Sequence, residues 1–226
     1  MRNLFKNFSI KAKSHIIYQS KVIKILGTYI SNDLSLDTEI GKLCATLHNR
    51  VFNINKIKQF TNFHTRLQFM NAYVIGKLRY MLPLYTQANN DNINKIHKII
   101  MRAARGAIGN YCCRFSIAKI LNICKWSTAK NMITHSAITT IHNIITKKKP
   151  LSIIKLFNMN NQRQSKQITT KYLPRTETFK KFYIYNIINI YNQIPSNIKS
   201  KSKFVFKKLS KKWIESYSPN VIDTMD

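Results

Sequence analysis

The chain has 226 residues, of which 38 are Lys or Arg and 8 are Asp or Glu, so its formal net charge is +30 at pH 7. Its apolar share of 44% is enough for a packed core, which excludes a disordered basic tail, and no apolar stretch reaches the ~18 residues of a membrane-spanning helix. A compact chain of this charge attracts polyanions, so nucleic acid or an anionic membrane surface is the expected partner, unless the lysines only solvate the surface.

The segment 1–30 has the composition of β-strands. Residues 14–18 and 21–30 are rich in Ile, Val and Tyr, which favours extended structure. A turn at 19–20 can connect them, and Gly27 indicates a bulge or a close backbone approach. The segment is therefore expected to form a β-hairpin. It also lacks the continuous apolar core of a signal peptide, so we expect an intracellular protein, nuclear or cytoplasmic, that is not secreted.

Three amphipathic helices follow, because apolar residues recur at helical spacing. The first is expected over 37–58. The second starts after the N-cap Asn62 and stops at Pro83, and the third covers 91–106. Their apolar faces consist of Ile40, Leu43, Cys44, Leu47, Val51 and Ile54, of Leu67, Met70, Val74, Leu78 and Met81, and of Ile93, Ile96, Ile100 and Ala104. The three helices predict a bundle over 31–110.

Polar N-caps mark the next two helices. Ser116 and Ser127 precede apolar-periodic stretches and can cap a short helix and a long helix. The long helix ends in a Lys-Lys-Lys-Pro run, where cations suit the helix dipole. The two apolar faces are Ile117, Ile120, Leu121 and Cys124, then Met132, Ile133, Ala137, Ile141 and Ile144. Residues 111–157 are therefore expected to form a helical connector.

The last part of the chain combines a polar stretch with two further helices. Residues 158–178 carry no apolar period, which predicts a loop or linker. The segment 179–194 is apolar on nearly all sides, which predicts a buried helix, or a strand, that stops at Pro195. A basic helix is expected from about 202 to 216, within a C-terminal helical region over 179–226. Its apolar side carries Val205, Phe206, Leu209 and Trp213.

Together these elements predict a mostly α fold, with a short N-terminal β-hairpin, a helical bundle and a looser helical C-terminal region. The chain contains 34 Ile, 29 Lys and 24 Asn but only 5 Gly, a bias that A/T-rich codons explain without any functional reason. That bias favours Lys over Arg, but it does not exclude acidic residues. The sign of the charge is therefore expected to be functional.

The eight carboxylates limit the chemistry of the chain. Metal-dependent nucleotidyl transfer needs clustered carboxylates, and the cluster Asp33, Asp37 and Glu39 stands where a helix begins, a position that favours acidic residues. No Tyr-x-Asp-Asp, P-loop or Gly-rich phosphate loop occurs. The possible zinc ligands Cys112, Cys124, His135 and His142 are too loosely spaced for a structural site. No catalytic residue, metal or other cofactor is therefore expected.

Seven short motifs occur in a familiar order: Lys24–Ile30 followed by Leu34 and Ser35, then Leu78–Pro83, Ile93–Gly109, Ile123–Ser127, Lys148–Leu151, Tyr191–Ile198 and Phe206–Leu209. This order resembles the thumb and C-terminal region of LINE-type (non-long-terminal-repeat) retrotransposon reverse transcriptases. Two motifs are the most specific. YNQIPSNI at Tyr191–Ile198 is similar to the family pattern W-N-x-L-P-x-x-I-r, and FKKL at Phe206–Leu209 is similar to F-K-x-x-L-k. The resemblance spans nearly the whole chain.

The resemblance implies a helical thumb and a C-terminal region that bind RNA or an RNA–DNA duplex through backbone phosphates. In the family, the fingers, the palm with its catalytic Asp pair and the endonuclease precede this region. The chain alone is therefore expected to be a non-catalytic fragment with no membrane partner, and Mg²⁺ belongs to the missing palm. Two alternatives stay open: a subunit of a split reverse transcriptase whose palm polypeptide is encoded elsewhere, and a degenerate or domesticated relic with a protein-interaction role.

Contacts to the nucleic-acid backbone come from Lys, Arg and helix termini, and they carry little sequence information. The candidate nucleic-acid-binding residues are Lys21, Lys24, Lys95, Lys98, Arg102, Arg105, Lys147, Lys148, Lys149, Lys207, Lys208, Lys211 and Lys212. Four aromatic side chains, Tyr183, Tyr185, Tyr191 and Trp213, can stack on bases, but packing in the core is the favoured interpretation for all four.

Overall fold

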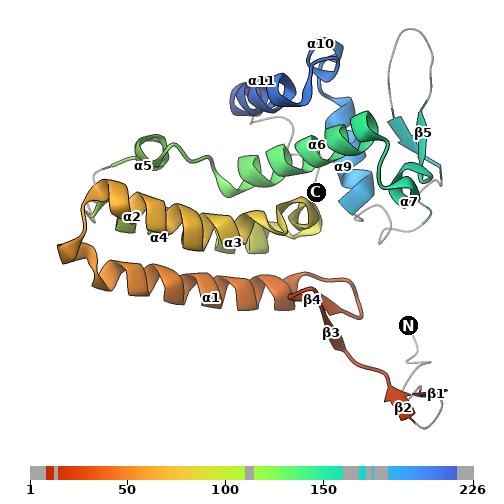
Figure 1. Cartoon of the computed structure of the whole chain (residues 1–226), viewed down its shortest axis with the longest axis horizontal. Helices are drawn as coiled ribbons and strands as arrows, with labels where there is room; N and C mark the ends of the chain where they lie inside the picture. The colour runs from red at the N-terminus through yellow and green to blue at the C-terminus, as the bar shows by residue number, and fades with distance from the viewer. Residues whose placement is uncertain are drawn as a thin grey trace.

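The computed structural model describes residues 9–12, 15–109, 115–159, 168–171, 175 and 183–217. The fold is mostly α with short strands near the N-terminus, as the sequence predicts. Figure 1 shows the long helices stacked in sequence order: α1 (Asp37–Lys56), α4 (Asn90–Ile108), α6 (Ala129–Lys147) and α11 (Lys203–Tyr217). In the described part of the chain, no helix has the length and apolar character needed to cross a membrane.

The predicted three-helix bundle is present. Its second member is a continuous helical path made of α2 (Phe63–Phe69), the π-helical turn η2 (Met70–Ile75) and α3 (Gly76–Arg79). The path ends at Arg79, before the predicted stop at Pro83, which lies inside the 3₁₀ helix η3 (Leu82–Gln87) that follows. Most of the predicted apolar faces are buried: Ile40, Leu47, Val51, Met70, Val74, Leu78, Ile96, Ile100 and Ala104 have 0% exposure, while Cys44, Leu67 and Met81 are half-buried at the edge of the core. The helical period alone therefore identified the core of this bundle.

Side-chain caps begin most of these helices. Asn62 Oδ1 accepts the Thr65 N–H at 2.9 Å, as predicted, and Ser116 Oγ accepts the Lys119 N–H at 3.3 Å at the start of α5 (Ile117–Cys124). The prediction for Ser127 is wrong. Thr128 Oγ1 caps α6 by accepting the Asn131 N–H at 3.3 Å, because the cap must directly precede the first helical residue.

The described part of the N-terminal region contains two β-hairpins, not the single hairpin expected. The strand β1 (Ser9–Ala12) pairs with β2 (His15–Tyr18), and β3 (Val22–Ile25) pairs with β4 (Thr28–Ser31), each in antiparallel register. The expected turn at 19–20 only links the two hairpins. The second hairpin turns at Leu26 and Gly27, whose φ angles are +50° and +84°. Both are left-handed, which is the geometry of a type I′ turn.

Two further strands occupy part of the expected linker. β5 (Phe157–Met159) and β6 (Ile168–Thr170) pair in antiparallel register, so the prediction of a structureless segment over 158–178 is wrong at these positions. Phe157 and Ile168 are buried in the C-terminal core. A three-residue strand is too short to show a period-2 pattern in the sequence, which explains the error. Most of the remaining linker lies outside the described residues.

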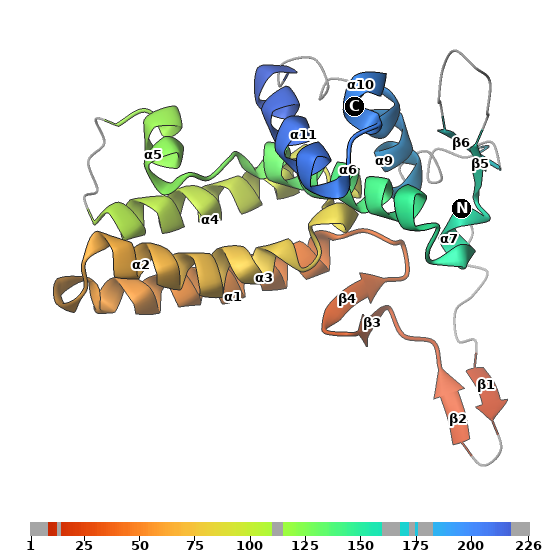
Figure 2. The ribbon, with the colours of Figure 1, turned by 45° about the horizontal axis from the view of Figure 1, so that its top comes forward.

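The buried residues form two clusters, and α6 belongs to both. The first cluster runs in sequence from Leu36 to Ile133, and the second runs from Ala137 to Ile214. The division therefore falls inside α6, whereas the sequence placed a boundary near residue 110. Figures 1 and 2 show α6 lying along the bundle with its first half and reaching α9 (Tyr183–Asn192) with its second half. The C-terminal region has a core of its own.

The C-terminal core is built around the predicted apolar helix. In α9 the buried side chains are Ile184, Ile187, Ile188, Ile190 and Tyr191. The short helices α7 (Leu151–Ile154) and α10 (Ser196–Lys199) follow Pro150 and Pro195. The buried side of α11 differs from the prediction. Phe206, Trp213 and Ile214 are buried, whereas Val205 is 40% exposed and faces away from the core.

Candidate nucleic-acid interface

All thirteen candidate cations lie at the surface. The set of Lys21, Lys24, Lys95, Lys98, Arg102, Arg105, Lys147, Lys148, Lys149, Lys207, Lys208, Lys211 and Lys212 is exposed throughout. They come from separate elements, namely the second hairpin, α4, the end of α6 and α11. The structure brings some of them together with cations that the sequence did not single out, and it leaves others apart.

The first group gathers beside the second hairpin. Lys24 lines a groove of about 490 Å³, which we call the hairpin groove. Tyr29, Lys42, Arg50 and Lys77 line the same groove. Lys42 Nζ lies 3.4 Å and Lys24 Nζ lies 5.5 Å from the centroid of the Tyr29 ring. The aromatic face thus holds two ammonium groups in one place. Lys42, Arg50 and Lys77 stand on helices outside the motifs that drew attention to Lys24.

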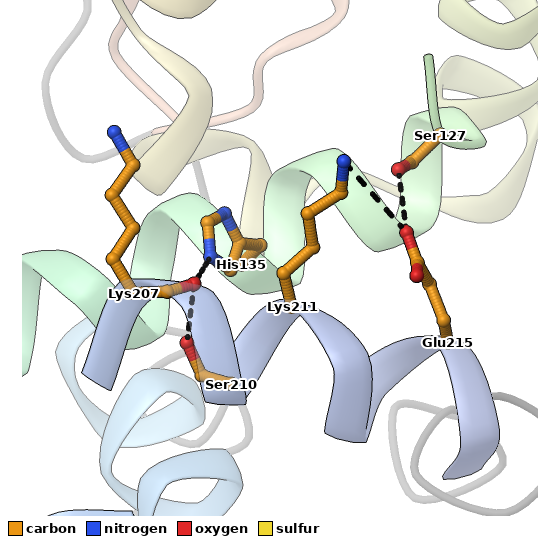
Figure 3. A network of polar contacts seen from close by, with 6 residues as sticks. All are labelled: Ser127, His135, Lys207, Ser210, Lys211 and Glu215. Carbon is orange, nitrogen blue, oxygen red and sulfur yellow. Dashed lines mark hydrogen bonds and ion pairs between the residues drawn. The ribbon is translucent and has the colours of Figure 1, made fainter. Parts of the chain in front are cut away.

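The second group lies between α6 and α11. A cleft of about 350 Å³, the α6–α11 cleft, is lined by the cations Arg79, Lys125, Lys207 and Lys211 and by the carboxylate Glu215. Figure 3 shows Lys207 and Lys211 extending from the same side of α11, over His135 and Ser127. Lys208 and Lys212 are exposed but do not line this cleft.

Polar contacts fix the geometry of the α6–α11 cleft. His135 Nε2 donates a hydrogen bond to the carbonyl oxygen of Lys207 at 2.9 Å, which ties α6 to α11. Burial lowers the pKa of His135 below its usual value, so the imidazole is neutral at pH 7. Ser127 Oγ donates to Glu215 Oε1 at 3.4 Å, and Lys211 Nζ lies 3.9 Å from the same oxygen.

The basic face of α4 is next to α1. Lys95 Nζ donates to Asn92 Oδ1 at 3.1 Å, and the guanidinium of Arg102 contacts the His48 ring. Lys98 and Arg105 complete this exposed face. Thr139 is the last residue of α6 that lines the cleft. The lysines at the end of this helix are about 12 Å or more farther along the chain direction; they are Lys147, Lys148 and Lys149. These two sets therefore stay separate from the α6–α11 cleft.

Three carboxylates near the start of α1 have structural partners. Glu39, which is 7% exposed, accepts the Tyr29 N–H at 2.7 Å and so attaches β4 to α1. Asp37 accepts the side-chain amide of Asn92 at 2.5 Å. A hydrogen bond from the Ser35 N–H, at 2.9 Å, lowers the pKa of Asp33. Within the described residues no group of three or more possible metal ligands comes together. Cys112, one of the four weighed for zinc, lies outside them.

Arg66 is a buried cation that the sequence did not reveal. Its guanidinium donates to the carbonyl oxygens of Ala107 at 3.0 Å and Lys58 at 3.1 Å, and also to that of Thr61. The contact with Ala107 places the charge at the C-terminus of α4, where the helix dipole favours a cation. A Cβ at Gly109, whose φ is +83°, would lie 2.8 Å from this guanidinium. Arg66 is therefore structural, not a nucleic-acid ligand.

The candidate stacking residues lie mainly inside the protein. Tyr191 is 4% and Trp213 is 8% exposed, and Tyr185 is half-buried, which agrees with core packing. Tyr191 Oη lies 3.3 Å from Nδ1 of His142, whose ring stacks on Phe206 with centroids 3.7 Å apart. Burial raises the pKa of Tyr191 to about 12. The side chain of Tyr183 lies outside the described residues.

The charged and the apolar side chains are separated in the described structure. Ammonium and guanidinium groups are gathered in the hairpin groove and in the α6–α11 cleft, while apolar side chains fill the two cores. Comparisons with protein-family models, with curated proteins and with solved structures gave no match.

Proposed function

We propose that the chain is a non-catalytic nucleic-acid-binding module that holds RNA or an RNA–DNA duplex through its backbone phosphates. The observation that carries the proposal is the separation of charge. All thirteen candidate cations are exposed, whereas described carboxylates such as Glu39 and Asp37 are engaged in contacts between elements. With 38 cations and 8 carboxylates, most cations have no acidic partner within the chain, and a polyanion supplies one.

The ordered motifs give the proposal its family context. The resemblance to the thumb and C-terminal region of LINE-type reverse transcriptases is consistent with a helical bundle followed by a basic C-terminal helix. The missing Tyr-x-Asp-Asp motif supports binding without polymerisation by this chain alone. Because the contacts are expected to be made to the nucleic-acid backbone, the protein should show little preference for the base sequence of the nucleic acid.

Salt titration tests the proposal. We expect fluorescence anisotropy with labelled single-stranded RNA and with an RNA–DNA duplex to give affinities that fall linearly on a plot of log K against log salt, because each neutralised phosphate releases counterions. Duplexes of different sequence are expected to bind within about threefold of one another. Binding that does not weaken with salt, or no binding at low salt, contradicts the proposal.

A second candidate is a subunit of a split reverse transcriptase, and the exposed second hairpin favours it. Ile23, Ile25 and Leu26 are 54%, 47% and 85% exposed, on a two-stranded sheet whose outer edges have no strand partner among the described residues. Open edges and exposed apolar side chains suit a neighbouring sheet. DNA synthesis on an RNA template that needs both this chain and a palm polypeptide encoded upstream would establish this role. Synthesis by the palm polypeptide alone contradicts it.

A further inference from the structure

The α6–α11 cleft divides four of the five lysines of α11 into two pairs. Lys207 and Lys211 line the cleft, and Lys208 and Lys212 do not. The reason is the helical period: residues four apart share a face, while the neighbouring residue is turned by about 100°. The sequence presents these lysines as one basic run, but the fold gives the two pairs different surroundings.

The cleft already holds an anionic group. Glu215 Oε1 lies 3.9 Å from Lys211 Nζ and 3.4 Å from Ser127 Oγ. An ammonium and a hydroxyl are also the groups that hold phosphate oxygens. The ion pair is half-exposed, with side-chain exposures of 49% and 48%, so it is weak and exchanges readily. The Glu215 carboxylate thus occupies a position suited to an oxygen of an external anion that belongs to a polyanion.

The remaining groups favour an incoming anion over the resident carboxylate. Arg79 and Lys125 line the same cleft, so four cations surround one carboxylate. The hydrogen bond from His135 to the Lys207 carbonyl holds α11 against α6, so the two lysines are positioned before any ligand arrives. Such preorganisation reduces the entropy lost on binding.

We propose that the α6–α11 cleft binds one phosphate group of a nucleic-acid backbone, with Lys207 and Lys211 as its direct ligands. The phosphate displaces the Glu215 carboxylate from Lys211, and Arg79 and Lys125 add to the attraction. This inference rests on the proposed function, which it narrows to a defined site. It also assigns a competing, inhibitory role to Glu215.

Two matched double variants of the full chain test the site. Lys207→Gln with Lys211→Gln removes the pair in the cleft, and Lys208→Gln with Lys212→Gln removes the same charge from the outer side of the same helix. With a 5′-hydroxyl RNA of about 12 nucleotides, we expect the first variant to lose about tenfold in affinity and about 1 in the slope of log K against log salt. The second variant is expected to lose only general attraction, less than about threefold.

A gain of affinity provides a test that misfolding cannot imitate. Glu215→Gln keeps the shape of the side chain and an acceptor for Ser127 but removes the competing charge, so we expect RNA to bind about threefold or more tightly. The matched control Asp91→Asn removes one negative charge from the exposed start of α4 and is expected to have a smaller effect, because salt screens distant charges.

The outcomes separate this inference from the proposed function. Equal losses in the two lysine variants, with binding retained by the unmodified chain, overturn the cleft site alone. Weaker binding by Glu215→Gln overturns the displacement by phosphate and makes Glu215 a positioning residue for Lys211. A difference between the lysine variants only with 5′-phosphorylated RNA reassigns the cleft to a terminal phosphate. No RNA binding by the unmodified chain overturns the proposed function as well.

Discussion

At the residue scale, the structure gives cations two opposite roles. Lys207 and Lys211 are exposed in a cleft that is lined by four cations and a single carboxylate. They are therefore available to an external anion. Arg66 is 8% exposed and binds three backbone carbonyl oxygens, one at the start of η1 (Lys58–Phe60), one directly after η1 and one at the end of α4. Its planar fork of donors suits this arrangement, which a lysine cannot reproduce.

Replacing Arg66 therefore tests stability and not binding. Arg66→Ala removes the charged donor from the buried Ala107 carbonyl and from the part-buried carbonyls of Lys58 and Thr61, and we expect the free energy of unfolding to fall by about 2–4 kcal/mol. Arg66→Lys is expected to recover part of this loss. Urea denaturation followed by circular dichroism measures both. Arg79→Ala, an exposed residue farther along the same helical path, is the control, with an expected change within about 0.5 kcal/mol. A similar loss in both alanine variants contradicts the structural role of Arg66.

At the element scale, scarcity of glycine affects the turns and helix ends. Leu26, Leu34, Lys125 and Lys148 all have positive φ, a conformation that costs a non-glycine residue about 1 kcal/mol. Lys125 and Lys148 end α5 and α6, where glycine is the usual residue. With only 5 Gly in the chain, other residues fill these positions. The sequence indicates a bulge or a close backbone approach at Gly27 rather than a turn, because Leu26 before it is not a residue that favours positive φ.

The second hairpin provides a test of this strain. Leu26 is 85% exposed, so Leu26→Asn removes little packing and places at this turn position a residue that tolerates positive φ. We expect the hairpin to be stabilised by about 0.5–1 kcal/mol, which slows amide hydrogen exchange in β3 and β4 about two- to fivefold. Ile23→Asn, at an exposed strand position, is expected to speed exchange. Unchanged or faster exchange in Leu26→Asn would show that the turn is not strained.

At the scale of the whole molecule, α6 joins two cores into one structure. Its residue Ile133 packs in the first core, while Ile138 and Ile141 pack in the second. The chain has two tryptophans, and each reports on a different core: Trp126 packs against the first and Trp213 lies in the second. Because a helix unfolds cooperatively, loss of either half of α6 is expected to destabilise both cores.

Single-tryptophan variants test this coupling. In Trp213→Phe the fluorescence reports on the first core, and in Trp126→Phe it reports on the second. We expect fluorescence and far-ultraviolet circular dichroism to give the same urea midpoint within each variant, which is the signature of two-state unfolding. Because the two probes are compared within one protein, a change of stability caused by the substitution does not affect the result. Separate midpoints would show that the two cores unfold independently.

The sequence by itself determined most of the elements and the overall electrostatics of this protein. The 3.6-residue period located α1 and α4 and most of their buried faces, because local spacing fixes which side of a helix is apolar. It also located α11, but the buried side of α11 differs from the predicted one. Asn62 and Ser116 marked helix starts through contacts only three residues long. The 38 cations and 8 carboxylates gave the sign of the surface charge without any knowledge of the fold.

Tertiary structure alone decided how the cations are grouped. Arg79 and Lys125 meet Lys207 and Lys211 in one cleft although more than 80 residues separate Lys125 from Lys207, and Arg66 meets a carbonyl oxygen 41 residues away. Such contacts depend on helix packing and on chain reversals at residues with positive φ, and neither leaves a local period in the sequence. The sequence therefore predicted a polyanionic partner, and the packing of α6 against α11 determined which lysines line the cleft.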